Sequence, residues 1–416
     1  MTTSRQAELA ERFGTPLYVY DLDEVDAARD ELMAALPAEF ELFYALKANP
    51  HPDLVRTLAA GPGRSCRPEI SSLGELDAVL AAGLPGDGCL YTGPGKTPDE
   101  LETALRRGVR LFSTDSVSDV EHVGAAAGRA GVLADCLLRV NSASASAATS
   151  IRMTGTPSQF GFDSEELPRV LPRLREIDGV RLAGLHFFPL SNAADDESLI
   201  GEFRHTIGLA AELEKDLGLP LHVLDIGGGF SAPYGVPGDR GRYPELAGEL
   251  ATTLDAHLPG WRFGTPRIAC ESGRFLVGRS GTLLTRVSNV KVSRGRRFVI
   301  LDAGINVFGG MSGIGRLLPV AVEVVAEGEH GSLVGPLCTP GDVLGREITV
   351  PAGLAPGDLL AIPNAGAYGL TASLLAFLSR PAPAELVVRG DAVVSATRLG
   401  LVRAGLPARE MKESVA

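Results

Sequence analysis

The sequence of 416 residues is 45% hydrophobic and carries a formal net charge of −12. Its length exceeds the roughly 250–300 residues at which one hydrophobic core stops growing, so we expect two domains. The acidic balance and the lack of a basic run exclude a non-specific nucleic-acid surface, because phosphate contacts draw on clustered lysine and arginine.

Cysteine usage and hydropathy bear on the compartment. The five cysteines are widely spaced without a CxxC pair, which argues against a disulfide framework and a zinc site. We therefore expect a reducing, cytoplasmic location and no metal. The N-terminal stretch MTTSRQAELAERFGTPLYVYD lacks an apolar signal-peptide core, and no apolar run approaches the ~20 residues of a spanning helix. The sequence predicts no membrane association.

Strand-like and helix-like segments alternate between about residues 40 and 270. Repeated strand-helix units indicate a parallel sheet, and this many favour a closed (β/α)8 barrel. The strand-like segments are 40–48, 110–115, 132–141, 180–188, 221–230 and 267–274, and the helix-like ones are 51–60, 116–131, 164–177, 198–218 and 243–258. After about residue 275, β-rich runs broken by glycine and proline are typical of an antiparallel second domain.

Residues that close the strand-like runs are the candidates for chemistry, because barrel enzymes carry their active sites at the carboxyl ends of the strands. Lys47 closes the run FYALKANP, where it could be either a solvated lysine or an amine held for chemistry. The glycines 227–229 could bring backbone N–H groups to an anion, although a tight turn explains them equally well. Glu271 could belong to an ordinary salt bridge at the end of a strand. Arg274 could be a surface arginine.

Together these residues fit one ligand. Pyridoxal phosphate requires a lysine for a Schiff base, a cradle for its phosphate, and a carboxylate that keeps the pyridine nitrogen protonated. Lys47 supplies the amine, the glycines with Arg274 supply the cradle, and Glu271 supplies the carboxylate.

At this point the chain resembles the fold-type III pyridoxal-phosphate decarboxylases, which include diaminopimelate, ornithine and arginine decarboxylases. The resemblance runs nearly from end to end, with several short motifs in the family's order. These motifs are GTPLYVYD (14–21), FYALKANP (43–50), EISSLGEL (69–76), LRVN (138–141), SQFGF (158–162), GLHFF (184–188), DIGGGF (225–230), CESGR (270–274), GPLCTPGDVL (335–344) and NAGAYG (364–369).

The resemblance implies a two-domain homodimer with shared active sites. A (β/α)8 TIM-type barrel, residues 25–268, would bind pyridoxal 5'-phosphate. An antiparallel β-barrel domain, residues 1–24 and 269–416, would contribute to the dimer interface. Carried over by motif, Lys47 forms the Schiff base and Glu271 pairs with the pyridine nitrogen. The implied phosphate ligands are Gly228, Gly229, Arg274 and Tyr368, with Ser191 as a further contact.

Cys338 is similar to the family's cysteine that reaches into the neighbouring subunit's site and acts as an acid near Cα. A thiol with a pKa near 8.5 can deliver a proton near neutral pH. Without the GPLC context, a small buried hydrophobe would be the preferred interpretation of this cysteine.

Two departures from the family pattern concern the substrate's distal end. Decarboxylases of free diamino acids carry an acidic residue after the cysteine, whereas this chain has Thr339 and then Pro340. Diaminopimelate decarboxylases carry an arginine and tyrosine clamp after DAG. Here the stretch 302–319 is glycine-rich, and Arg316 is a basic residue nearby but not at the matching spacing.

A third departure lies in the family's HxHxGS stretch. His186 occupies the first histidine position, and it could be a catalytic group or a core histidine. Phe188 occupies the second, where a histidine stacks on the cofactor face. An aromatic ring can still pack on the pyridine, but it cannot transfer a proton or hydrogen-bond a substrate carboxylate.

These departures indicate a roomier, less charged distal pocket. We predict α-decarboxylation of an amino acid, in the branch of the family that acts on modified or acyl-carrier-protein-tethered aminoacyl groups in secondary metabolism. Three alternatives stay open: a decarboxylase of free diaminopimelate or another free amino acid, an amino-acid racemase on the same scaffold, and a non-catalytic pyridoxal-phosphate-binding protein. The GPLC segment favours decarboxylation over racemisation, and the second domain disfavours a non-catalytic carrier.

Overall fold

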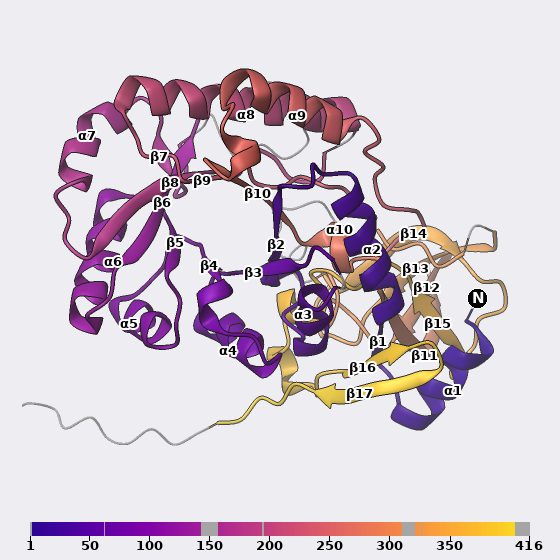
Figure 1. Cartoon of the computed structure of the whole chain (residues 1–416). Helices are drawn as coiled ribbons and strands as arrows, with labels where there is room; N and C mark the ends of the chain where they lie inside the picture. Colours follow the sequence, from indigo (N-terminus) through magenta and orange to yellow (C-terminus); the bar gives the residue numbers. More distant parts are fainter. Residues whose placement is uncertain are drawn as a thin grey trace, which may run out of the picture.

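The computed structural model describes residues 2–61, 63–142, 157–193, 195–309, 321–325 and 327–403. A barrel of parallel strands ringed by helices lies beside a second sheet, which combines an N-terminal strand with the C-terminal strands (Figure 1). None of the described helices is long and apolar enough to cross a membrane.

The barrel closes through eight parallel strands, so the predicted TIM-type fold is confirmed. Their order is β2-β3-β4-β5-β6-β8-β9-β10, and β10 returns to β2. The strands are β2 (Glu41–Ala45), β3 (Cys66–Ile70), β4 (Leu90–Tyr91), β5 (Leu111–Thr114), β6 (Ala134–Asn141), β8 (Val180–Phe187), β9 (Val223–Asp225) and β10 (Arg267–Ser272), with the short β7 (Phe162–Asp163) beside β6. The barrel therefore runs to Ser272, past the predicted boundary at residue 268, because β10 completes its hydrogen bonding to β2.

Helices surround the barrel, and local capping explains where several begin. The side chains of Ser72, Thr97 and Ser116 accept hydrogen bonds from backbone N–H groups three residues on. Thr97 and Glu100 form a reciprocal capping box. The helices are α2 (Leu22–Ala34), α3 (Pro52–Ala59), α4 (Leu73–Ala81), α5 (Pro98–Arg106), α6 (Val117–Ala130), α7 (Leu167–Leu174), α8 (Asp196–Leu217), α9 (Leu246–His257) and α10 (Arg274–Val277).

Two layers of side chains fill the barrel. The apolar layer consists of Phe43, Leu90, Leu111, Leu137, Ala183, Val223 and Ala269. Because side chains alternate along a strand, residues two positions further point inward again, nearer the carboxyl ends. We call the resulting set the polar layer; it consists of Glu69, Thr92, Ser113, Arg139, His186, Asp225 and Glu271. Contacts within this layer show that its side chains face one another: Thr92 Oγ1 donates to Glu69 Oε1 at 2.6 Å between neighbouring strands, and Ser113 Oγ lies 2.6 Å from His186 Nδ1 across β6.

A bulge brings β8 into the polar layer. The pairing of β6 with β8 shifts register between Cys136 and Leu137, which leaves Ala183 without a register partner on β6. Gly184 follows with a φ of +153°, and a Cβ there would collide with the carbonyl of Val223. The extra residue turns His186 inward in place of Leu185.

The second sheet joins the two ends of the chain. Its strand order is β14-β13-β12-β11-β1-β16-β17, with β15 on β11. The pairs β1–β16 and β12–β13 are parallel, so this predominantly antiparallel sheet is mixed. The elements are α1 (Ser4–Phe13), β1 (Leu17–Asp21), β11 (Gly281–Ser293), β12 (Arg296–Leu301), β13 (Glu329–Val334), β14 (Val343–Val350), β15 (Leu359–Ile362), β16 (Ala384–Arg389) and β17 (Ala392–Arg398).

Candidate active site

A pocket lies at the carboxyl ends of the barrel strands, above the polar layer. Its walls come from the ends of β2 and β10, the loops after β8 and β9, and the segment 364–369 of the second domain. Eight of the predicted site residues line it: Lys47, Phe188, Ser191, Gly228, Gly229, Glu271, Arg274 and Tyr368. Residues predicted from separate motifs therefore meet in one place.

Lys47 lies in a single 3-10 turn, Leu46–Ala48, immediately after β2. Its Nζ is 3.4 Å from each carboxylate oxygen of Glu69 and 5.2 Å from the centre of the Phe188 ring. Burial disfavours the charged amine, but the carboxylates of Glu69 and Glu271 outweigh burial and hold the pKa of Lys47 above its usual value. The neighbouring carboxylates therefore favour the charged form of the amine, although the Lys47 side chain is 41% exposed at the mouth of the pocket.

The glycine segment after β9 presents bare backbone to the pocket. Gly229 has a φ of +129°, and a Cβ there would collide with the side chain of Leu190. A Cβ on Gly228 would collide with the carbonyl of Glu271. Since neither position can hold a side chain, the main chain itself forms this wall, as expected of a cradle for an anion.

Arg274 and Tyr368 complete this end of the pocket. The Arg274 guanidinium lies over the Tyr368 ring, 5.2 Å from its centre. Tyr368 adopts a left-handed φ of +51° and donates its backbone N–H to the carbonyl of Ala48 over 2.7 Å. Its own carbonyl accepts from the Tyr234 hydroxyl at 2.9 Å. Strained residues that are held in this way gather at functional sites.

Glu271 connects the pocket to the polar layer. Its Oε1 lies 3.1 Å from His186 Nε2, and His186 Nδ1 lies 2.6 Å from Ser113 Oγ. Burial would raise the pKa of Glu271, but the nearby His186 and Lys47 outweigh burial and hold that pKa below its usual value. An ionised carboxylate therefore faces the pocket from a site that is only 2% exposed.

Asp225 lies beside this carboxylate. Burial and the charge of Glu271 raise the pKa of Asp225 to about 7. The ligand atoms of His186, Asp225 and Glu271 lie within 4.8 Å of one another, a spacing that could also hold a metal ion, which the sequence did not predict. The lysine and the glycine cradle next to this cluster favour an organic cofactor.

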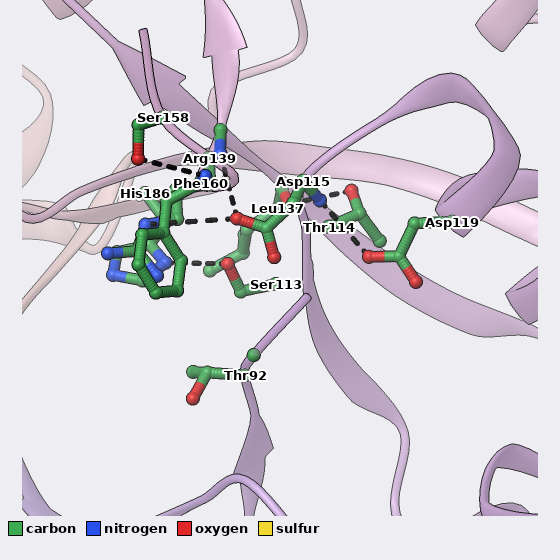
Figure 2. Close-up of polar contacts among 12 residues, drawn as sticks. Thr92, Ser113, Thr114, Asp115, Asp119, Leu137, Arg139, Ser158, Phe160 and His186 are labelled. Carbon is green, nitrogen blue, oxygen red and sulfur yellow. Dashed lines mark hydrogen bonds and ion pairs between the residues drawn. The ribbon is translucent and has the colours of Figure 1, made fainter. Parts of the chain in front are cut away.

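Arg139 adds a cation to the polar layer. Its guanidinium lies 4.7 Å from the centre of the Phe160 ring and 5.7 Å from that of Phe188. Nε is 4.0 Å from Asp115 Oδ1. Figure 2 shows Arg139 and Phe160 gathered with His186 and other polar-layer residues. The arginine therefore borders the same pocket wall as Phe188.

Sequence reasoning missed five residues of the polar layer: Glu69, Thr92, Ser113, Arg139 and Asp225. Glu69, Arg139 and Asp225 lie in the recognised motifs EISSLGEL, LRVN and DIGGGF, but none was singled out. Ser113, Arg139 and Asp225 each follow an inward apolar residue by two positions. That spacing could have identified them once the inward face of each strand was known.

Three of the predicted residues that the structure describes do not line the pocket. His186 lies behind Glu271, which gives it contact with a carboxylate instead of the cofactor face. Cys338 and Thr339 lie on the β13–β14 loop, where Cys338 is exposed, so the interpretation as a buried hydrophobe is wrong. Arg316 lies outside the described residues, as does most of the glycine-rich stretch 302–319.

The residues present fit pyridoxal phosphate. Glu271 Oε1 and Ser272 Oγ are buried without a hydrogen-bond partner among the described residues, because the His186 contact lacks hydrogen-bond geometry. Buried polar atoms in this state cost free energy unless a ligand satisfies them. A charged lysine, an ionised carboxylate and a glycine cradle with an arginine match an aldehyde, a pyridine nitrogen and a phosphate.

Comparison with known proteins agrees with this chemistry. Residues 22–278 match the family model described as pyridoxal-dependent decarboxylase, pyridoxal binding domain. The chain belongs to the pyridoxal-dependent decarboxylase family. It is therefore a pyridoxal-phosphate-dependent carboxy-lyase that acts on an amino acid.

Relatives in this family differ in their substrates. The chain is 30% identical to the L-glutamyl-[BtrI acyl-carrier protein] decarboxylase of Niallia circulans, over 94% of this chain and 93% of that one. It is 35% identical to the diaminopimelate decarboxylase of Deinococcus radiodurans, over 94% and 95%. Among solved structures, diaminopimelate decarboxylase from Helicobacter pylori complexed with L-lysine superposes with a TM-score of 0.78 at 27% identity, covering 93% of this chain and 94% of that one.

Proposed function

We propose that this decarboxylase acts on an aminoacyl group tethered to an acyl-carrier protein. The α-amino and α-carboxylate groups of such a substrate are free, while the carrier arm masks its distal carboxyl. The relative from Niallia circulans, whose name states a carrier-bound glutamyl substrate, supports this proposal. Relatives that are diaminopimelate decarboxylases have similar identity, so the substrate must be argued from the site.

The observation that carries the proposal is the orientation of the acidic side chain on the Cys338 loop, residues 335–342. Thr339 follows the cysteine, and the one acidic residue among 335–342 is Asp342. Asp342 is 3% exposed and accepts backbone hydrogen bonds from Ile305 at 2.8 Å and from Leu337 at 2.7 Å. Because its carboxylate is turned inward, this loop offers no partner for a distal ammonium group.

The pocket residues have distinct proposed roles. Pyridoxal phosphate, when bound, supplies a ring that accepts the electrons left behind by departing CO2. Lys47 would hold its aldehyde, and Glu271 would keep its pyridine nitrogen protonated. The phosphate would be held by Gly228, Gly229, Arg274, Tyr368 and Ser191, all of which line the pocket. Phe188 would pack on the ring.

Cys338 would act in a second subunit's site within a homodimer. Its exposure, and its absence from the lining of its own pocket, support this role. At that position the thiol would deliver a proton to the carbon that loses CO2. Thr339, next to it, would border the distal part of the substrate.

Substrate competition tests the proposal. The purified enzyme would be given an L-glutamyl thioester on an acyl-carrier protein, free L-glutamate, meso-diaminopimelate and L-ornithine, with CO2 release as the measurement. We expect kcat/KM for the tethered substrate to exceed that for each free amino acid by at least about a hundredfold. Diaminopimelate and ornithine carry a distal ammonium group, for which the Cys338 loop offers no partner. Free glutamate carries a distal carboxylate that the carrier arm masks in the tethered substrate. Turnover of free meso-diaminopimelate or ornithine at an equal rate would overturn the proposal.

A further inference from the structure

A line of three buried side chains runs from β5 to the pocket. Ser113 Oγ is 2.6 Å from His186 Nδ1, and His186 Nε2 is 3.1 Å from Glu271 Oε1. Their exposed fractions are 0%, 1% and 2%, so bulk water does not compete for these contacts. We propose that Ser113 and His186 are positioning residues that hold the Glu271 carboxylate ionised and oriented for the pyridine nitrogen of the cofactor. This inference rests on the proposed role of Glu271.

The hydroxyl of Ser113 can fix the tautomer of the His186 imidazole. A serine hydroxyl has a single hydrogen, and a neutral imidazole has one donor and one acceptor nitrogen. When Ser113 donates to Nδ1, the ring hydrogen must lie on Nε2, which faces Glu271 (Figure 2 shows Ser113 beside His186). The pair therefore presents a donor to the carboxylate without requiring a charged histidine.

Comparison with the neighbouring carboxyl shows what His186 accomplishes. Asp225 and Glu271 are equally buried, at 0% and 2% exposure. Burial and the charge of Glu271 raise the pKa of Asp225, whereas His186 and Lys47 outweigh burial at Glu271 and lower its pKa. The pKa values of the two adjacent carboxyls are thus shifted in opposite directions. The negative charge therefore lies on Glu271, which lines the pocket.

The remaining charges around the carboxylate come from other strands. Glu69 on β3 repels it, while Lys47 after β2 and Arg139 on β6 attract it. None of these three donates a hydrogen bond to Glu271, whereas His186 Nε2 approaches Oε1 to 3.1 Å and is the group best placed to orient the carboxylate. Because the 3.1 Å contact with His186 lacks hydrogen-bond geometry, Glu271 Oε1 can still accept a hydrogen bond from a group bound in the pocket.

Cofactor binding to the apoenzyme tests the inference without any amino-acid substrate. Ser113→Ala should weaken the Kd for pyridoxal phosphate by about tenfold, and Ser113→Thr, which keeps the hydroxyl, should recover most of the loss. Thr114→Val is the matched control, because Thr114 is the next residue of β5 and donates its buried hydroxyl to the Leu137 carbonyl at 3.1 Å. It should change the Kd by less than about twofold.

A double-mutant cycle tests whether Ser113 affects cofactor affinity through Glu271. In a Glu271→Gln background, Ser113→Ala should cause no further loss of affinity, because the carboxylate that Ser113 and His186 position is then absent. Equal losses from Ser113→Ala and Thr114→Val, or an undiminished loss in the Glu271→Gln background, would overturn the inference. If Ser113→Ala does not fold, His186→Gln enters the same cycle with the same expectation. Since no substrate is present, these outcomes are independent of whether the true substrate is tethered.

Discussion

The side-chain amide of Asn49 donates a hydrogen bond to the carbonyl of Gly366 over 2.9 Å. This contact joins the turn after Lys47 in the barrel to the second-domain segment that carries Tyr368. Asn49 Oδ1 also accepts from the backbone N–H of His51 at 3.1 Å. The lysine and the tyrosine of the pocket are therefore held together from opposite ends of the chain.

Asn49→Asp should loosen this junction. The aspartate keeps an acceptor for the His51 N–H but sets a carboxylate oxygen against the Gly366 carbonyl, so a donor is lost inside a buried contact. We expect the Kd for pyridoxal phosphate, measured by equilibrium dialysis, to rise about tenfold. The same exchange at Asn289, which is exposed on β11, serves as the control and should leave the Kd unchanged. Equal affinities in the two variants would contradict the role of Asn49.

Subunit complementation tests the proposed position of Cys338. Cys338→Ala and Lys47→Ala should each lose nearly all activity as homodimers. When the two are mixed and allowed to exchange subunits, half of the dimers are mixed and each holds one intact site, so about a quarter of wild-type activity should return. Lys47→Ala mixed with Lys47→Arg should regain none. A mixture of the cysteine and lysine variants with no regained activity would place both residues in the same subunit's site.

Glu385 gives the second domain a pH-dependent stability. It is 5% exposed, and burial raises its pKa to about 7 even though the Tyr20 hydroxyl, 3.1 Å from Oε1, lowers it. A raised folded-state pKa means that the stabilisation is complete below about pH 4.3, the unfolded value, and is lost as the pH rises to about 7. Above that range the folded protein carries a buried charge.

Glu385→Gln should therefore stabilise the protein at pH 8, by an amount on the order of 2–3 kcal/mol, with little change at pH 4.5. The measurement is the thermal midpoint at both pH values. Glu212→Gln, at an exposed position on α8, is the control and should leave both midpoints unchanged. A shift of equal size at both pH values would show that the effect is packing and not ionisation.

The alternation of strand-like and helix-like segments predicted the fold class. Local motifs predicted most of the pocket, because the relevant residues stand next to one another in the chain. The glycines 227–229 and the pair Glu271 and Arg274 each carry their chemistry within a few positions. Glu69 and Ser113 are different, because each lies near the end of a short strand with no neighbouring residue that marks it as part of the site. Pairing of β2 with β3 brings Glu69 to Lys47, and the curvature of the barrel brings Ser113 on β5 to His186 on β8.

The histidine shows a second limit of sequence reasoning. Counting by twos from Ala183 predicts that Leu185 faces the barrel interior, but the bulge at Ala183 and Gly184 turns His186 inward instead. Bulges of this kind leave a weak mark in the sequence, here a single glycine. The surroundings of Cys338 could not be predicted for another reason: the site in which we propose that it acts belongs to a second subunit.

The most direct test of the site uses borohydride reduction of the enzyme loaded with pyridoxal phosphate, followed by digestion and mass spectrometry. We predict one phosphopyridoxyl group, on Lys47, and loss of the reducible visible absorbance in Lys47→Ala. Lys291→Ala, at an exposed position on β11, should keep both the label and the absorbance. A label on another lysine, or an unchanged reducible chromophore in Lys47→Ala, would contradict the account.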